Sequence, residues 1–177
     1  NGWTFVSVEG EMNWTIATYQ GNHYAYANGY SGGSTHANED WCISPAFNLN
    51  AYSNPVLTFR TAKNYNGPDI EVFFSSDYNG TDPSAATWQE LECALSTGSW
   101  TWTESGDIDL SAFSGSNCYI GFKYTCTDES AAGWEVDDIM LDCFEDLLFG
   151  HGEGAGWRMP KQPEGAVPND FYIEGGA

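Results

Sequence analysis

The sequence predicts an all-β protein: a jelly-roll β-sandwich of two antiparallel sheets with an irregular C-terminal extension. Apolar residues alternate at every second position or form short β-rich runs, and clusters of Gly, Asn, Ser and Pro separate these segments. No segment shows the helical spacing of apolar residues over three turns. Successive strands lie close in the chain without crossover helices, which favours two antiparallel sheets packed face to face. A β-barrel is the alternative architecture.

The expected strands follow one another from the N-terminus to Leu141. Each is a short run that fits a pleated surface with one buried face. They are Trp3 to Val8, Asn13 to Ala17, Tyr24 to Ala27, Asp40 to Phe47, Pro55 to Ala62, Asp69 to Ser75, Thr87 to Leu91, Thr101 to Ile108, Asn117 to Tyr124 and Gly133 to Leu141.

The strand pattern divides the chain into residues 1–142, one sandwich domain, and residues 143–177, a Gly/Pro-rich extension or linker. A length of 177 residues is enough for one domain with a substantial core. The tail contains the apolar clusters Trp157 to Met159 and Phe171 to Ile173. We interpret it as a linker toward a neighbouring domain or, alternatively, as a strand that pairs with a sheet edge of its own or another chain.

The chain is strongly acidic. Five Lys and Arg residues against 25 Asp and Glu residues give a formal net charge of −20. Nucleic acids and anionic membranes are therefore excluded as partners, because both are bound mainly through basic side chains. The crowded carboxylates favour a salty or calcium-containing medium. No apolar stretch is long enough to span a membrane, so we expect no membrane insertion.

The five cysteines include no Cys-x-x-Cys pair, which argues against a zinc ribbon, a thioredoxin-like site or a dense disulfide scaffold. Cys118 and Cys126 share the strand parity of Ile120, Phe122 and Tyr124. We therefore expect them to be small buried thiols on the inner face of a strand.

A series of short motifs runs in a definite order from Ser34 to Leu141. The motifs are Asn38 to Pro45, Phe47 to Leu49, Pro55 to Arg60, Ile70 to Gly80, Trp88, Gly106 to Ser111, Tyr119 to Tyr124 and Trp134 to Ile139. In this order they resemble the choice-of-anchor J domain and its relative, the cleaved adhesin domain of gingipain-type surface proteins. The tail beyond Asp142 does not match this pattern.

The resemblance implies a jelly-roll domain of secreted, surface-anchored or multidomain proteins of the Bacteroidota type. Such domains serve adhesion or bind glycans and other ligands, often with bound calcium, and catalysis is not expected of them. The expected location is therefore secreted or cell surface. The expected partner is an extracellular glycan or protein ligand, with neighbouring domains or subunits as further partners of the tail.

Two clusters of oxygen-bearing side chains are candidate calcium ligands, because calcium prefers carboxylate and amide oxygens. They are Asn38-Glu39-Asp40, and Asp137-Asp138 in the last strand. The resemblance suggests Glu9 as a third contributor, since jelly-roll domains commonly tie the first strand to the last through such an ion. Asp137 and Asp138 face opposite sides of a regular strand, so both can reach one ion only at a bulge. The alternative is that these carboxylates are hydrogen-bonded without a metal.

Aromatic side chains form the second candidate site. Trp100 and Trp102 share one strand face, and Tyr65 and Tyr78 are expected in nearby loops. Trp and Tyr rings stack on sugar rings with little loss of side-chain entropy. The alternative is that these rings pack in the core or between the sheets.

Three patterns that suggest catalysis are rejected. Gly29 to Gly33 matches Gly-x-Ser-x-Gly, but no helix is expected after it, as a nucleophile elbow requires. Glu135-Val136-Asp137 matches the start of the Glu-x-Asp-x-Glu array of jelly-roll β-glucanases, but Ile139 takes the place of the last carboxylate. The histidines His23, His36 and His151 lack zinc-ligand spacing.

The sequence therefore predicts a non-enzymatic, extracellular module that binds a ligand such as a glycan, or presents an adhesive surface, and that calcium stabilises. Two other classes stay open. One is a structural subunit that assembles through its C-terminal tail, and the other is a secreted glycan hydrolase that uses Glu135 and a second carboxylate.

Overall fold

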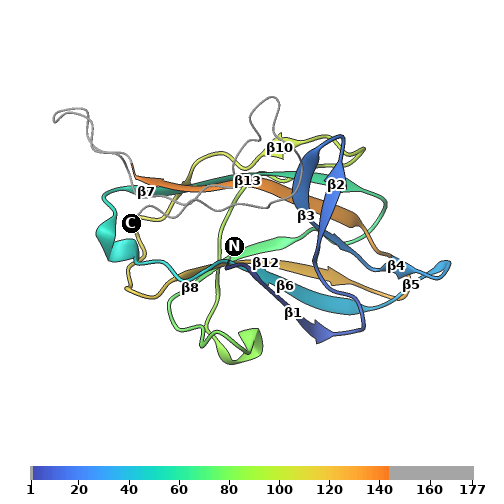
Figure 1. The fold of residues 1–177 in the computed structure, drawn as a ribbon, viewed down its shortest axis with the longest axis horizontal. Helices are drawn as coiled ribbons and strands as arrows, with labels where there is room; N and C mark the ends of the chain where they lie inside the picture. The colour runs from blue at the N-terminus through green and yellow to red at the C-terminus, as the bar shows by residue number, and fades with distance from the viewer. Residues whose placement is uncertain (1, 144–177) are drawn as a thin grey trace.

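The computed structural model describes residues 2–143, which form a β-sandwich of two antiparallel sheets. Figure 1 shows the two sheets as layers, seen nearly edge-on. The described residues contain two short 3-10 turns, η1 (Leu49–Ala51) and η2 (Pro83–Ala85), and no α-helix. The predicted fold class is confirmed.

Each sheet combines strands that are distant in the chain. Sheet A has the order β1 (Thr4–Glu9), β6 (Asn38–Ile43), β12 (Tyr119–Cys126), β8 (Glu71–Ser75) and β9 (Gln89–Glu90). Sheet B has the order β10 (Thr103–Glu104), β7 (Pro55–Asn64), β13 (Gly133–Cys143), β3 (Asn22–Asn28) and β2 (Thr15–Tyr19), and β11 (Ile108–Asp109) also pairs with β7. The strands β4 (Tyr30–Ser31) and β5 (Ser34–Thr35) form a separate hairpin at one end of the sandwich (Figure 1).

The main core lies between the two sheets. Alternate residues of the central strands point inward, so that Phe59 of β7 meets Phe122 of β12 edge-on, with ring centroids 5.0 Å apart. Trp134 and Val136 of β13 are fully buried in the same core. The burial of rings from both sheets stabilises their packing against each other, and the side chains on the outer face of each sheet take no part in this core.

A second, smaller cluster covers the outer face of sheet A. Trp41 and Ile43 of β6 project there and pack with Tyr78, Trp88 and Phe73. Residues 76–88, which contain η2, lie over this face (Figure 1). These aromatic rings are therefore part of the protein interior.

Several strand boundaries differ from the prediction. The expected strand Thr101 to Ile108 is two short strands, β10 and β11, which pair separately with β7. The expected strand Thr87 to Leu91 is reduced to β9, and the hairpin of β4 and β5 was not predicted. These differences all involve two-residue strands. Such strands are too short for alternating apolar and polar residues to predict their pairing.

The described cysteines Cys42, Cys93, Cys118 and Cys126 are all free, and Cys118 and Cys126 are buried as predicted. Burial raises the pKa of the Cys42 thiol far above its ordinary value. Within residues 2–143, no helix is long and apolar enough to cross a membrane. The predicted extension beyond residue 143 lies outside the described residues.

Candidate functional site

The outer face of sheet B carries a row of aromatic side chains, of which Tyr24 is buried and Tyr26, Trp100 and Trp102 are partly exposed. Tyr24 and Tyr26 of β3 alternate with the inward-facing Ala25 and Ala27. Trp100 and Trp102 approach the same face from the segment that leads into β10. The Tyr24 and Trp102 rings meet edge-on at 5.9 Å, and the Tyr26 and Trp100 rings are tilted at 6.4 Å.

These rings line a hollow of about 910 Å³, called here the first hollow. Tyr19, the last residue of β2, and Gln20, in the turn that follows, also line it, and Tyr19 is 65% exposed. Arg60 and Glu135 add polar groups to the lining. A hollow lined by aromatic rings and a few fixed polar groups is a typical site for an organic ligand.

Trp100 is held in place by its backbone and by the absence of a side chain beneath it. Its N–H donates to the carbonyl of Lys63 at 2.8 Å, and both Ser99 and Trp100 have left-handed backbone conformations, with φ of 60° and 53°. A Cβ added to Gly133 would lie 2.8 Å from Cη2 of Trp100. The indole therefore lies directly over β13, and the uncommon backbone conformation supports an assignment to function.

Arg60 lies beside Trp102 and links it to two carboxylates of β13. Its guanidinium lies 4.6 Å from the centre of the Trp102 ring and forms ion pairs with Asp137 at 2.7 Å and Asp138 at 3.0 Å. Asn22 Nδ2 donates a second hydrogen bond to Asp137 at 2.9 Å. A β-bulge in β13, where Asp138 has a φ of 49°, turns both carboxylates toward Arg60.

Glu135 and Tyr24 form a hydrogen-bonded pair on the same face. Burial and the neighbouring Glu135 carboxylate raise the pKa of Tyr24 to about 12. Burial also raises the pKa of Glu135. The pair thus presents hydroxyl and carboxyl oxygens that can accept hydrogen bonds from a polar ligand.

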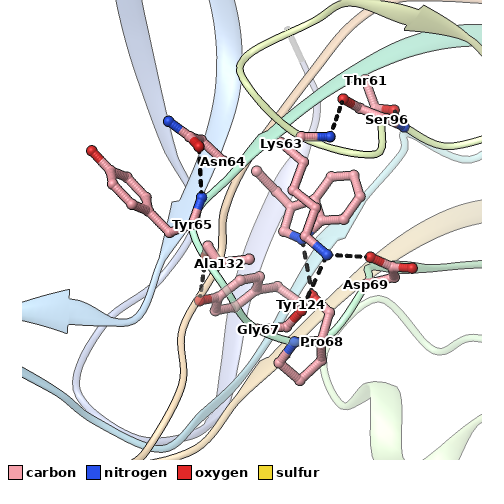
Figure 2. A network of polar contacts seen from close by, with 12 residues as sticks. Thr61, Lys63, Asn64, Tyr65, Gly67, Pro68, Asp69, Ser96, Tyr124 and Ala132 are labelled. Carbon is pink, nitrogen blue, oxygen red and sulfur yellow. Dashed lines mark hydrogen bonds and ion pairs between the residues drawn. The ribbon is translucent and has the colours of Figure 1, made fainter.

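Figure 2 shows how the neighbouring loops are fixed. Lys63 donates to the carbonyl of Gly67 at 3.1 Å and pairs with Asp69, which shapes the loop that carries Tyr65. The N–H of Ser96 donates to Oγ1 of Thr61 at 2.9 Å, which anchors the segment that leads to Trp100. Both aromatic side chains therefore project from loops that are tied to β7.

The structure brings three of the four predicted ligand-binding residues together. Trp100 and Trp102 line the first hollow, and Tyr65 meets Trp100 edge-on at 6.0 Å. The expectation that Tyr78 belongs with them is wrong. Tyr78 is 3% exposed and packs against Trp88 and Tyr119 on the outer face of sheet A. Its loop covers that sheet, which strand parity alone did not reveal.

The predicted metal ligands do not form one site. Asn38 lies opposite Cys126 and Asp40 opposite Tyr124, and both partners have their side chains in the core. Asn38 and Asp40 therefore lie on the inner face of sheet A, toward the core between the two sheets. Glu9 lies opposite Glu39 and shares its outward direction, because a bulge in β1 shifts the register.

The other two predicted ligands belong to a different sheet. Asp137 and Asp138 lie on sheet B with Arg60 as their counterion. No group of three or more His, Cys, Asp or Glu side chains within residues 2–143 is arranged to hold a metal ion.

One observation still favours a cation near Asn38 and Asp40. Asp40 is 1% exposed, and its Oδ1 has no hydrogen-bond partner. Burial raises the pKa of Asp40 to about 6, against a hydrogen bond from Ser7 that lowers it. A buried, unsatisfied carboxylate is costly unless it binds a proton or a cation. Calcium at these two residues stays a prediction.

The patterns rejected as catalytic occupy structural positions. Gly29 to Gly33 enters the hairpin of β4 and β5, and strand β6 follows it. His23 lies in β3 and hydrogen-bonds to Thr18, whereas His36 lies between β5 and β6 and hydrogen-bonds to Ser34. The third, His151, lies outside the described residues.

Two comparisons with known proteins find no match: no family model and no curated protein matches the sequence. Among solved structures, the chain is similar to two domains of Lys-gingipain from Porphyromonas gingivalis. For its K1 cleaved adhesin domain the identity is 18% and the TM-score 0.53, over 81% of this chain and 92% of that domain. For the K3 domain the identity is 18% and the TM-score 0.56, over the same shares. The protein has the fold of a cleaved adhesin domain. Membership of the choice-of-anchor J family stays a prediction.

Sequence reasoning missed Tyr24, Tyr26, Arg60 and Glu135 as parts of the aromatic site. The Tyr24-Ala25-Tyr26-Ala27 alternation is a usable signal, because small residues on one face and tyrosines on the other indicate a strand with two different faces. The approach of Trp102 to Arg60 joins distant segments and had no such signal.

Proposed function

We propose that this protein is a non-catalytic, extracellular binding module that holds a glycan in the first hollow. The observation that carries the proposal is the set of four aromatic side chains, Tyr24, Tyr26, Trp100 and Trp102, on the open face of sheet B. Sugar rings present apolar C–H faces that stack on such rings, while their hydroxyls hydrogen-bond to neighbouring polar groups. Tyr24 and Glu135 supply such groups.

The charges around the hollow favour a glycan without acidic groups. The basic residues of the described chain, Arg60, Lys63 and Lys123, all form ion pairs with carboxylates. Arg60, which lines the hollow, faces two carboxylates. An anionic sugar would meet a net negative surface here, and like charges repel.

The cleaved adhesin fold supports a binding role and a location outside the cell, as the two gingipain domains are named adhesins. The role is non-catalytic in this proposal, because Glu135 is bonded to Tyr24, and Asp137 to Arg60 and Asn22. We also keep calcium at Asn38 and Asp40 as part of the proposal. Bound calcium would neutralise the buried carboxylate there.

The test is retention on a panel of neutral polysaccharides, namely cellulose, xylan, mannan and chitin, by affinity electrophoresis or pull-down. Wild-type protein is expected to bind at least one, and Trp102→Ala is expected to weaken that binding about tenfold or more. Ile16→Ala is the matched control, because Ile16 is exposed on β2 but points away from its neighbour Ala17, which lines the hollow.

Binding that is unchanged in Trp102→Ala would move the site elsewhere on the molecule. Absence of retention on every polysaccharide of the panel would overturn the glycan proposal.

A further inference from the structure

We infer that the binding site continues past Trp100 into a second hollow, so that the ligand is a linear glycan long enough to occupy both. This inference rests on the proposed function of the first hollow and specifies the shape of its ligand. The second hollow has a volume of about 510 Å³ and is lined by Tyr30, Tyr65, Asn28 and Glu129, among others.

The two hollows are adjacent, because they share side chains in their linings. Tyr26 and Trp100 line both of them. The Trp100 ring lies between its two neighbours, 6.4 Å from the Tyr26 ring and 6.0 Å from the Tyr65 ring, measured between centroids. A ligand that leaves the first hollow along this row meets the second hollow next.

Exposed tyrosines lie beside both hollows. Tyr19 is 65% exposed beside the first hollow, whereas Tyr30 and Tyr65 are 56% and 65% exposed beside the second. Exposed aromatic rings that adjoin a hollow form part of a contiguous apolar surface, and such surfaces mark binding sites. Their presence beside both hollows favours an extended ligand over a single sugar.

Tyr65 is held in its exposed position by the protein. Its φ is 65°, an uncommon conformation for a bulky residue, and Oδ1 of Asn64 accepts its N–H at 2.9 Å (Figure 2). Lys63 fixes the same loop from the other side through Gly67 and Asp69. A preorganised ring loses little entropy when a ligand binds.

The lining also restricts the chemistry of the chain that crosses it. Glu129 lines the second hollow and Glu135 the first, and among the described lining residues the sole basic side chain is Arg60, which is ion-paired. We therefore expect a chain of sugars without carboxylate or sulfate groups.

The experiment is calorimetric titration with disaccharides and hexasaccharides of the cello-, xylo- and manno- series, with a galacturonic acid hexasaccharide as the anionic control. The hexasaccharide of the preferred series is expected to bind wild-type protein at least tenfold more tightly than its disaccharide. The anionic hexasaccharide is expected not to bind.

The variants separate the two hollows. Tyr65→Ala and Tyr30→Ala, alone and together, are expected to weaken hexasaccharide binding about fivefold or more. Tyr30→Ala alone is expected to leave disaccharide binding unchanged, whereas Tyr65→Ala also removes a contact of the Trp100 ring. Trp102→Ala is expected to weaken both. Because Tyr30 and Tyr65 are largely exposed, their removal is not expected to unfold the protein, which circular dichroism checks.

Equal affinity for the two lengths, or a hexasaccharide affinity unaffected by Tyr65→Ala, would overturn the second hollow while leaving the first in place. Absence of binding by any neutral saccharide would remove the proposed function and this inference together.

Discussion

The outer faces of the two sheets carry similar aromatic residues and use them differently. On sheet A, the ring centroids of Trp41 and Trp88 lie 4.8 Å apart. Trp88 belongs to the covering segment, residues 76–88, and its Nε1 donates to the carbonyl of Pro83 in η2. On sheet B, Trp100 and Trp102 line an open hollow. The same aromatic residue types therefore form a buried cluster on one sheet and line a hollow on the other. The difference is that residues 76–88 cover the face of sheet A.

The largest contrast is expected in unfolding. Trp41→Ala should lower the free energy of unfolding by about 3–5 kcal/mol, because it leaves a cavity among packed rings. Trp102→Ala should cost less, since one side of its ring already faces the hollow. Urea denaturation at neutral pH measures both. Equal losses would mean that the face of sheet B is a core like that of sheet A.

The ion pairs of the two faces give the next contrast. Arg60→Met should destabilise the protein by about 2–3 kcal/mol, because it leaves Asp137 and Asp138 close together without their counterion. Lys123→Met is the matched control. Lys123 lies 5.7 Å from the Trp41 ring and pairs with the more exposed Glu39 and Glu71, so its loss should cost about 0–1 kcal/mol. Thermal unfolding distinguishes them, and similar losses would contradict the role given to Arg60.

The unpaired Asp40 contrasts with the paired carboxylates of sheet B. Its folded-state pKa of about 6 lies above the ordinary 3.8, so its contribution to stability is present below pH about 4 and is lost as the pH rises through 6. Asp40→Asn should therefore stabilise the metal-free protein by about 2 kcal/mol at pH 7 and have little effect at pH 4.

Calcium would change that result in a recognisable way. If calcium binds at Asn38 and Asp40, a chelator lowers the melting temperature of wild-type protein but not of Asp40→Asn. A chelator without effect on either would remove calcium from the proposal. Destabilisation of Asp40→Asn at pH 7 in chelator would contradict the raised pKa.

The smallest expected effects come from two glycines that lie under indole rings. A Cβ at Gly121 would lie 3.0 Å from Trp88 and 3.1 Å from Trp41, which are packed on both sides. Gly121→Ala should therefore destabilise by about 1–2 kcal/mol. A Cβ at Gly133 would instead push Trp100 toward the open side of the first hollow. Gly133→Ala should therefore lower glycan affinity and change the melting temperature less than Gly121→Ala does. The reverse pattern would contradict the difference between the faces.

The sequence was sufficient for the sandwich because strand alternation reports which side of each strand is buried. It could not assign an outer face to a site. Trp102 and Trp88 lie in similar polar surroundings in the sequence, yet Trp88 is covered by its own loop through the contact with Pro83. The prediction of Tyr78 as a ligand residue was wrong for the same reason.

The metal prediction shows a second limit. Adjacent carboxylates in the sequence, such as Asp137 and Asp138, suggested an ion, but the partner proved to be Arg60 from a strand 77 positions away in the chain. Local shifts in strand register decide which side chains meet across a sheet. The bulges near Glu9 and Asp138 each redirected a side chain in a way that regular alternation does not encode.

The position of β13 in sheet B bears on how the protein matures. This strand pairs with β3 on one side and β7 on the other, and it contributes Glu135 and the carboxylates that face Arg60. Because synthesis proceeds from the N-terminus, β2, β3 and β7 emerge from the ribosome before the strand that joins them. The first hollow is consequently complete only once β13 has been inserted between β3 and β7, and ligand binding would report that insertion.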